Sequence, residues 1–215
     1  MARSNNHIPN PPLSAKRVFL WITLAGALAL GGCMEESVLV DRKALTDGGN
    51  FIVLPFADAP GEQADGSGRV VTGAIAAQML LEPNVKLFDV GPIKLNEALE
   101  ATGFDEMDVN DPVVAAAVGR KLDAQFVITG ELIHYATEKQ ASSNTVWIFQ
   151  GGGTKTRHWI CLHLRVVRAS DGKIVYAGHG SSCSDEGYAA AAENACEEAL
   201  ADLDNILRGK NQYGW

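Results

Sequence analysis

The sequence predicts an α/β fold in which helices pack on a mixed β-sheet. Three features of the hydrophobic pattern predict it. Short apolar runs alternate with helical stripes between residues 51 and 122, apolar runs then follow one another from 124 to 184, and one last helical stripe closes the domain. Strands that alternate with helices and then continue as hairpins give a sheet with parallel and antiparallel pairs. The expected order is β-α-β-α-α-β-β-β-α.

The first 32 residues have the pattern of a secretory signal peptide. Lys16 and Arg17 precede an apolar run over residues 18–30, and the segment contains no Asp or Glu. The run is shorter than the roughly 20 residues of a membrane-spanning helix, and a basic flank before a short apolar core marks a secretory signal. We therefore expect removal of 1–32, a lipidated tether over 33–49, a single domain over 50–208 and an exposed tail over 209–215.

The sequence Leu30-Gly31-Gly32-Cys33 resembles the bacterial lipobox. The resemblance implies that Cys33 is lipidated with fatty chains such as palmitate and becomes the first residue of the mature chain. Two or more acyl chains hold a protein stably at a bilayer. Met34 follows Cys33, and the absence of Asp there favours the periplasmic face of an outer membrane.

The mature chain is acidic. Removal of the signal segment takes away three of the 18 basic residues, which leaves 15 against 26 acidic ones and a net charge of −11. Domains that bind nucleic acid carry basic patches, and charge alone attaches only basic proteins to anionic lipid. The charge balance therefore excludes nucleic acid as a partner and excludes a membrane contact made by charge alone.

Two strands and three helices are expected in the first half of the domain. A buried strand over 51–56 is closed by a proline, and a second strand spans 84–90. Between them, 69–82 place four apolar residues on one helical stripe, namely Val71, Ile75, Met79 and Leu80. The segments 92–103 and 111–122 each have a proline in the first turn, which is typical of a helix start.

The second half is expected to contain three strands and a long helix. The first strand spans 124–140, with Gly130 as a candidate bulge. A short apolar run over 145–150 follows, and the three glycines at 151–153 are expected to form a loop tip between strands. The final helix spans 185–209, and its apolar stripe includes Cys196.

The turn at 170–172 predicts the register of the last two strands. Alternate residues of 159–167, from Ile160 to Val166, face the core. A three-residue turn with a left-handed Gly172 sets Tyr176 opposite Val166, and Ile174 then joins the same core face. We prefer this turn to a two-residue one because it keeps Lys173 out of the core.

Three cysteines remain in the mature chain, namely Cys161, Cys183 and Cys196. In an oxidising compartment, one disulfide and one spare thiol are expected. The predicted register places Cys161 and Cys183 on one face of adjacent strands, one diagonal step apart, whereas Cys196 lies on the final helix. The pair Cys161–Cys183 is therefore the candidate disulfide.

No motif points to catalysis, to a metal or to a cofactor. His163 lies two residues after Cys161, but a zinc site normally has two closely spaced ligand pairs and only one is present. The glycines of 65–71 precede a helix, where a phosphate could bind, but the lysine of a P-loop is missing. We expect a flexible loop there, and the sequence contains no Gly-x-Ser-x-Gly motif.

Four segments together resemble the CsgG-like envelope lipoproteins. They are FIVLPFAD at 51–58, FDVG at 88–91, DAQFVITGELIHY at 123–135 and LHLRVVRASDGKIVYAG at 162–178. The family includes the curli secretion lipoprotein, the Pel polysaccharide export lipoprotein and a lipoprotein activator of a penicillin-binding protein. The resemblance covers about 51–207 and implies a non-enzymatic periplasmic domain that is tethered to the outer membrane and often assembles into rings.

These observations predict a structural or assembly lipoprotein of an envelope export or appendage complex that forms a homo-oligomeric ring. A monomeric activator of a cell-wall synthase is the first alternative, and a metal-dependent hydrolase is the second. Trp147, Ile148 and Phe149 beside the glycines are the candidate interface with another subunit or envelope protein, because exposed aromatic patches mark interfaces. The alternative for these three residues is packing in the core of their own subunit.

Overall fold

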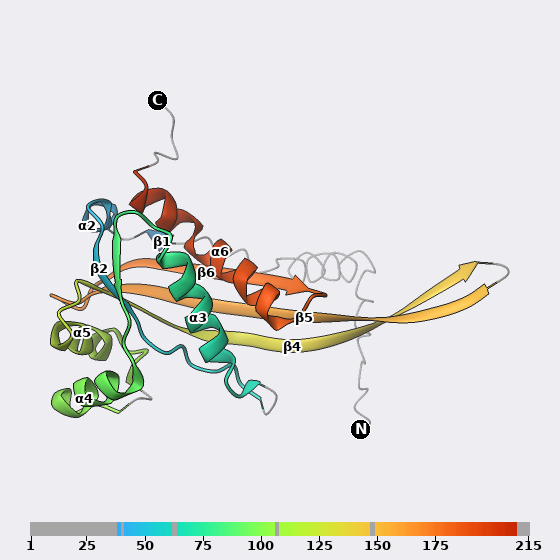
Figure 1. Ribbon diagram of the computed structural model, residues 1–215, viewed down its shortest axis with the longest axis horizontal. Helices are drawn as coiled ribbons and strands as arrows, with labels where there is room; N and C mark the ends of the chain where they lie inside the picture. Colours follow the sequence, from blue (N-terminus) through green and yellow to red (C-terminus); the bar gives the residue numbers. More distant parts are fainter. Residues whose placement is uncertain (1–37, 40, 62–63, 106–107, 147–148, 210–215) are drawn as a thin grey trace, which may run out of the picture. The chain divides into compact units, whose positions relative to one another are not determined.

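The computed structural model describes residues 38–39, 41–61, 64–105, 108–146 and 149–209. All of them belong to the second of two compact units, which begins at Glu36. In these residues one mixed sheet carries helices on both faces, as the sequence predicts (Figure 1). Cys33, Trp147 and Ile148 lie outside the described residues.

The sheet has six strands in the order β1-β6-β5-β4-β2-β3. Strand β2 runs parallel to both β3 and β4, whereas β4, β5, β6 and β1 are joined by antiparallel pairs. The strands are β1 (Val38–Leu39), β2 (Gly49–Val53), β3 (Val85–Phe88), β4 (Phe126–Val146), β5 (Phe149–Arg168) and β6 (Ile174–Ser184). The parallel pairs follow from the helices inserted between β2, β3 and β4, since a parallel pair needs a long crossover.

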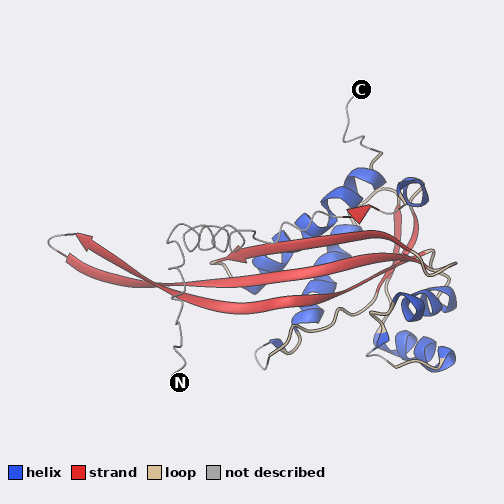
Figure 2. Ribbon diagram, turned by 180° about the vertical axis from the view of Figure 1, so that it is seen from behind, coloured by secondary structure: helices blue, strands red, loops and turns tan. Residues whose placement is uncertain are grey.

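Two hydrophobic cores lie on opposite faces of the sheet (Figure 2). On one face, α2 (Arg42–Thr46), α3 (Ser67–Met79) and α6 (Tyr188–Leu207) cover the larger core. On the other face, α4 (Pro92–Thr102) and α5 (Pro112–Lys121) cover a smaller core near the start of β4. Both of these helices begin with a proline, as predicted.

Helix α6 packs directly on the backbone of β6. A Cβ atom on Gly178 would lie 2.1 Å from the carbonyl oxygen of Ala199, and one on Gly180 would lie 1.8 Å from that of Ala195. The hydroxyl of the buried Tyr176 donates a hydrogen bond of 2.7 Å to the same Ala199 oxygen. The two glycines therefore allow a close approach that no larger residue permits.

The predicted left-handed Gly172 and the pairing of Val166 with Tyr176 are confirmed, but the three-residue turn is wrong, because the Arg168 amide donates to the Lys173 carbonyl oxygen across the four residues 169–172. Gly172 has a φ of 71°, and Val166 pairs with Tyr176. The prediction for Ile174 is wrong, because a register shift after Val166 pairs Ile174 with Val167. Ile174 therefore packs against the smaller core, on the opposite face from Tyr176.

The bulge in β4 lies at a different residue from the predicted one. The register shifts between Leu132 and His134, and Gly130 is paired regularly with Leu164. Position 130 requires a glycine for another reason. A Cβ atom there would lie 2.1 Å from the His163 carbonyl oxygen and 2.5 Å from the Phe56 ring. Close packing, and not a bulge, requires the glycine.

Part of the segment expected to be an irregular tether is packed on the domain. Strand β1 pairs with β6, and α2 places Leu45, which is fully buried, in the larger core. Asp41 caps α2 through the Ala44 amide and also forms an ion pair of 3.2 Å with Arg168. The described part of the tether is therefore part of the folded domain.

Candidate functional site

The hairpin of β4 and β5 extends beyond the rest of the sheet. The last pair between β5 and β6 joins His158 to Ser184, whereas β4 and β5 continue to pair until Val146 meets Phe149. We call residues 138–146 and 149–157 the arm. Its nine residue pairs correspond to about 30 Å of strand.

The prediction of a loop tip at the three glycines is wrong. Gly151, Gly152 and Gly153 lie within β5 and pair with Asn144, Ser143 and Ser142. Strand β4 ends at Val146 and β5 begins at Phe149, which is the described member of the predicted interface triplet. Its placement at the far end of the arm agrees with a contact outside the subunit, but the role of the triplet stays a prediction.

Within the described residues, no third strand pairs with the arm, although Lys155 at its base forms an ion pair with Asp185. Beyond β6, its strands pair only with each other, and both outer edges carry unpaired backbone groups. Its sequence is polar or small except for Ala141, Val146 and Phe149. A two-stranded hairpin is marginally stable in water, and unpaired edges are templates for contact with another chain.

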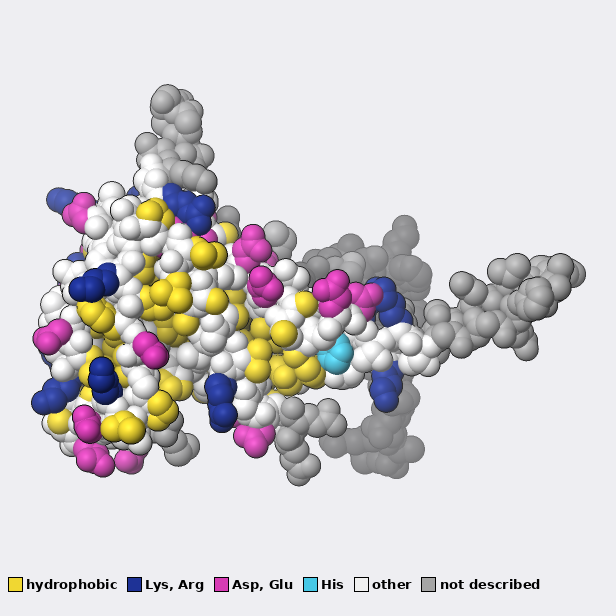
Figure 3. Space-filling model, in the orientation of Figure 1, with side chains coloured by type: hydrophobic (Ala, Val, Ile, Leu, Met, Phe, Trp, Pro, Cys, Tyr) yellow, Lys and Arg dark blue, Asp and Glu magenta, His cyan; other side chains and the backbone are white. Residues whose placement is uncertain are grey.

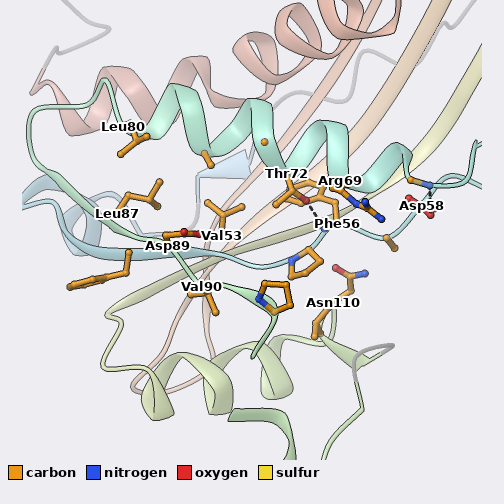
Figure 4. A pocket seen from close by; sticks show the side chains of 18 of the residues that line it. Val53, Phe56, Asp58, Arg69, Thr72, Leu80, Leu87, Asp89, Val90 and Asn110 are labelled. Carbon is orange, nitrogen blue, oxygen red and sulfur yellow. Dashed lines mark hydrogen bonds between the residues drawn. The ribbon is translucent and has the colours of Figure 1, made fainter. Parts of the chain in front are cut away.

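A groove of about 1270 Å³ lies between α3 and the ends of β2 and β3 (Figure 4). One wall is the side of α3 that carries Arg69, Thr72 and Leu80. The floor is formed by the ends of the parallel strands β2 and β3, with Val53 and Leu87 among the lining residues. Such crevices at the carboxyl ends of parallel strands are common binding positions.

The start of α3 is held by a carboxylate of the same chain. Asp58 accepts hydrogen bonds from the amides of Gly66 at 2.9 Å and Gly68 at 2.6 Å. Ser67 donates to Asp58 at 3.4 Å and accepts from the Ala59 amide at 3.1 Å. The predicted flexible loop is therefore a closed turn, and Asp58 takes the place that an anion would occupy at a helix start.

A second pair of hydrogen bonds connects the groove floor to α3. The Phe56 amide donates to the Thr72 hydroxyl at 3.0 Å, and that hydroxyl donates to the Gly68 carbonyl oxygen at 2.7 Å (Figure 4). A Cβ atom on Gly68 would lie 2.0 Å from the Phe56 carbonyl oxygen. The groove is thus built on a rigid junction between the end of β2 and the first turns of α3.

The rim of the groove is apolar. Leu80, predicted to lie on the buried stripe of α3, is 68% exposed, and the adjacent Leu81 is 76% exposed. The space-filling view shows hydrophobic side chains at the surface between α3 and the α4–α5 pair (Figure 3). The apolar run at the end of α3 hid this feature, because hydrophobic residues in sequence do not reveal which of them are covered.

The cysteines are placed as the predicted register requires. Cys161 pairs with Ser181 and Cys183 with Trp159, so the two cysteines share a face one diagonal step apart. Within the described residues no disulfide joins Cys161, Cys183 and Cys196. Diagonal neighbours lie about 7–8 Å apart, slightly beyond the usual disulfide range, and the bond between Cys161 and Cys183 stays a prediction.

The histidines near these cysteines form contacts across β5 and β6. The rings of His163 and His179 lie 4.9 Å apart, and His179 Nε2 lies 3.9 Å from Cys161 Sγ. No group of three or more His, Cys, Asp or Glu side chains in the described parts of the chain is arranged to hold a metal ion. Burial raises the pKa of the Cys196 thiol to about 12, so this cysteine stays protonated on the buried side of α6.

None of the described helices has both the length and the apolar character needed to cross a membrane. In the described part of the chain, the groove and the arm are the candidate binding surfaces. The sequence predicted Phe149 as an interface residue beside a loop tip at the three glycines, and it predicted neither the arm nor the groove. The signal available for the groove was the small and polar side of α3, where Thr72, Gly73 and Ala76 follow Arg69 at helical spacing.

No protein-family model matches the sequence, and no curated protein matches it. Solved structures with similar folds include the PelC dodecamer from Paraburkholderia phytofirmans. The match to PelC covers 79% of this chain and 96% of the PelC chain, with 14% sequence identity and a TM-score of 0.51. Lipoprotein GNA1162 from Neisseria meningitidis has 16% identity and a TM-score of 0.42, over 63% of this chain and 83% of that one.

The C-terminal domain of LpoB from Salmonella enterica has 17% identity and a TM-score of 0.39, over 74% of this chain and 90% of that domain. Sequence identities this low are evidence of fold alone. PelC has the highest TM-score of these three structures, and we compare the fold with PelC only. The described domain therefore has the fold of a PelC subunit.

Proposed function

We propose that this chain is a non-enzymatic lipoprotein on the periplasmic face of an outer membrane, where it forms a homo-oligomeric ring. In this role it is a structural or assembly component of an envelope export or appendage complex. The observation that carries the proposal is the fold shared with PelC, a dodecamer, across 96% of the PelC chain. The CsgG-like segments and the lipobox support the same assignment.

The lipid anchor in this proposal is Cys33. Four residues separate it from Val38, the first residue of β1. Because β1 is paired with β6, the mature chain has a short tether and a domain that begins almost at once. A short tether favours a subunit held against the membrane over one that reaches far from it.

The arm supports assembly over a monomeric role. A monomer would leave its two strands paired only with each other in water, which is marginally stable. An assembly can cover them with a second copy and bury the apolar tip of the hairpin. The monomeric activator of a cell-wall synthase remains the competing function, and its distinguishing property is the absence of a ring.

Native mass spectrometry of the detergent-extracted protein tests this proposal. The expected result is one dominant species whose mass is a whole multiple of the lipidated mature subunit. A Cys33→Ser variant is the matched control for the anchor, and it should retain residues 1–32 and lose the acyl mass. A monomer at micromolar concentration would contradict the ring and favour the activator, whereas an unlipidated wild-type chain would contradict the anchor.

A further inference from the structure

We propose that the arm of one copy of this chain lies in the groove of the next copy. This inference rests on the proposed function, because it names the contact through which the ring forms. Each subunit then contributes an arm to one neighbour and a groove to the other. The occupant of the groove is thus a second copy of the chain.

The arm is the basic part of an acidic protein. Lys139, Lys155 and Arg157 outnumber its single acid, Glu138, so its net charge is +2, whereas the mature chain has a net charge of −11. Lys139 is exposed, and Lys155 is half exposed although it forms an ion pair of 2.7 Å with Asp185. All of these charges lie in the three residue pairs of the arm that are next to β6, so the positive charge is at the base of the arm, and its outer residues are uncharged.

The groove has the opposite charge. Its charged lining residues are Asp58, Asp65, Asp89 and Arg69, which give a net charge of −2. Asp65 and Asp89 are exposed, and Asp58 is already bound to the first turn of α3. Complementary charge steers the encounter of two surfaces and selects their register.

Apolar surface gathers at the same place. The large hydrophobic side chains exposed in the described residues are Val70, Leu80, Leu81, Ile93, Val113 and Ile133. Leu80 lines the groove, and three of the others are next in sequence to lining residues. Contiguous exposed apolar surface marks an interaction site, and the few apolar residues of the arm lie mostly at its far end, where Val146 pairs with Phe149.

The placement of the two surfaces favours contact between two copies over contact within one. The arm leaves the sheet at the end opposite α4 and α5 (Figure 1), whereas the groove lies between α3 and the loops that lead to these helices. An arm that points away from its own groove can fill only that of another subunit. Contacts between two different surfaces of identical chains propagate head to tail, and they close into a ring when the rotation between subunits permits.

Reciprocal charge reversal tests the contact. The groove variant is D65K/D89K and the arm variant is K139E/R157E, in the lipidated full chain, with ring dissociation followed by mass photometry on dilution. Each variant alone should raise the dissociation concentration at least about tenfold, because like charges then face each other. Combining all four changes should return it to within about threefold of wild type.

Matched controls reverse exposed charges elsewhere, Glu193→Lys on α6 and Lys121→Glu on α5, and these should leave dissociation unchanged. A variant that only damages its own fold is not rescued by the second pair of changes. If the wild-type ring forms but the combined variant is no better than either pair alone, the arm does not occupy the groove, although the ring stands. A wild-type monomer overturns both the ring and this contact.

A second comparison uses two exposed apolar residues of similar exposure. Leu80 in the groove is 68% exposed and Val113 on α5 is 65% exposed. Leu80→Ser should weaken the ring at least about tenfold, whereas Val113→Ser should leave it intact, and neither should change the stability of the isolated subunit by more than about 0.5 kcal/mol. Equal effects of the two variants on the ring would overturn the proposed contact.

Discussion

Removal of the carboxylate at position 58 should destabilise the domain through the first turn of α3. Asp58 accepts from the amides of Gly66 and Gly68 at 2.9 and 2.6 Å. Gly68 is buried, so its amide cannot turn to water when the acceptor is removed. In Asp58→Ala, one buried donor loses its charged partner and one exposed donor becomes hydrated.

The size of this effect follows from the two donors. An unsatisfied buried donor costs about 1–3 kcal/mol, and loss of a capping side chain costs about 0.5–2 kcal/mol. These two costs do not add in full, because both concern hydrogen bonds of the same two amides. We therefore expect Asp58→Ala to lower the free energy of unfolding by about 2 kcal/mol. A domain of this size should then unfold about 4–8 °C lower than the wild type.

Two companion variants make this prediction specific. Asp58→Asn keeps an acceptor for only one of the two amides, which bond to different oxygens of Asp58, and it loses the charge at the helix start, so it should cost about 0.5–2 kcal/mol, less than Asp58→Ala. Asp65→Asn removes an exposed acid from the same loop and should change stability by less than about 0.5 kcal/mol. Urea unfolding followed by circular dichroism, at one protein concentration low enough for the subunits to be dissociated, measures all three without a contribution from assembly. The reasoning is refuted if Asp58→Ala matches Asp65→Asn.

Further expectations concern α6 and the cysteines. Gly180→Ala should destabilise the domain by about 1–3 kcal/mol, because the new Cβ would lie 1.8 Å from the Ala195 carbonyl oxygen. Gly73→Ala should instead stabilise α3 by up to about 1 kcal/mol, since a Cβ there meets no atom within 4 Å. The same urea unfolding assay measures both. The raised pKa of Cys196, about 12 against an ordinary 9.0, implies stability that is fully present below pH 9 and is lost as pH rises towards 12, since only the unfolded state releases the proton in that range. The difference in the free energy of unfolding between wild type and Cys196→Ala should therefore shrink by up to about 4 kcal/mol between pH 9 and pH 12. Unfolding curves recorded at alkaline pH measure it. Peptide mapping without reductant should recover Cys161 linked to Cys183 from periplasmic protein, and recovery of both as unlinked thiols would contradict the predicted disulfide.

Much of the fold follows from local pattern in the sequence. The prolines at the starts of α4 and α5 and the left-handed Gly172 each act within a few residues, and all three have the predicted structural role. The pairing of Tyr176 with Val166 does not follow from the turn alone, since the strands shift by one residue between Val166 and Val167. It follows from burial, because a slip by one residue would exchange the buried and exposed faces, and Tyr176 is fully buried.

The features that the sequence did not predict depend on contacts between distant segments. Helix α2 has five residues, and only Leu45 among them is buried, so no helical stripe is visible in its sequence. The role of Gly130 is set by the Phe56 ring and the His163 backbone. The arm is polar and rich in glycine, and without alternating apolar residues it has the pattern of a loop although β4 and β5 pair along its length.

The candidate site was predictable only in part. Phe149 was proposed as an interface residue from its aromatic side chain beside glycines, and the structure places it at the end of the arm. The groove was missed because it combines the far side of α3 with the ends of two strands, and Leu80 was assigned to the buried stripe. Residues that meet only in the folded chain leave no local signal.

Cryo-electron microscopy of the native protein in lipid nanodiscs tests the central claim most directly. The account predicts class averages of a closed ring of identical subunits on one side of the bilayer, with density from each hairpin of β4 and β5 reaching the adjacent subunit. Single subunits scattered on the bilayer, or protein that does not associate with the nanodiscs, would contradict it.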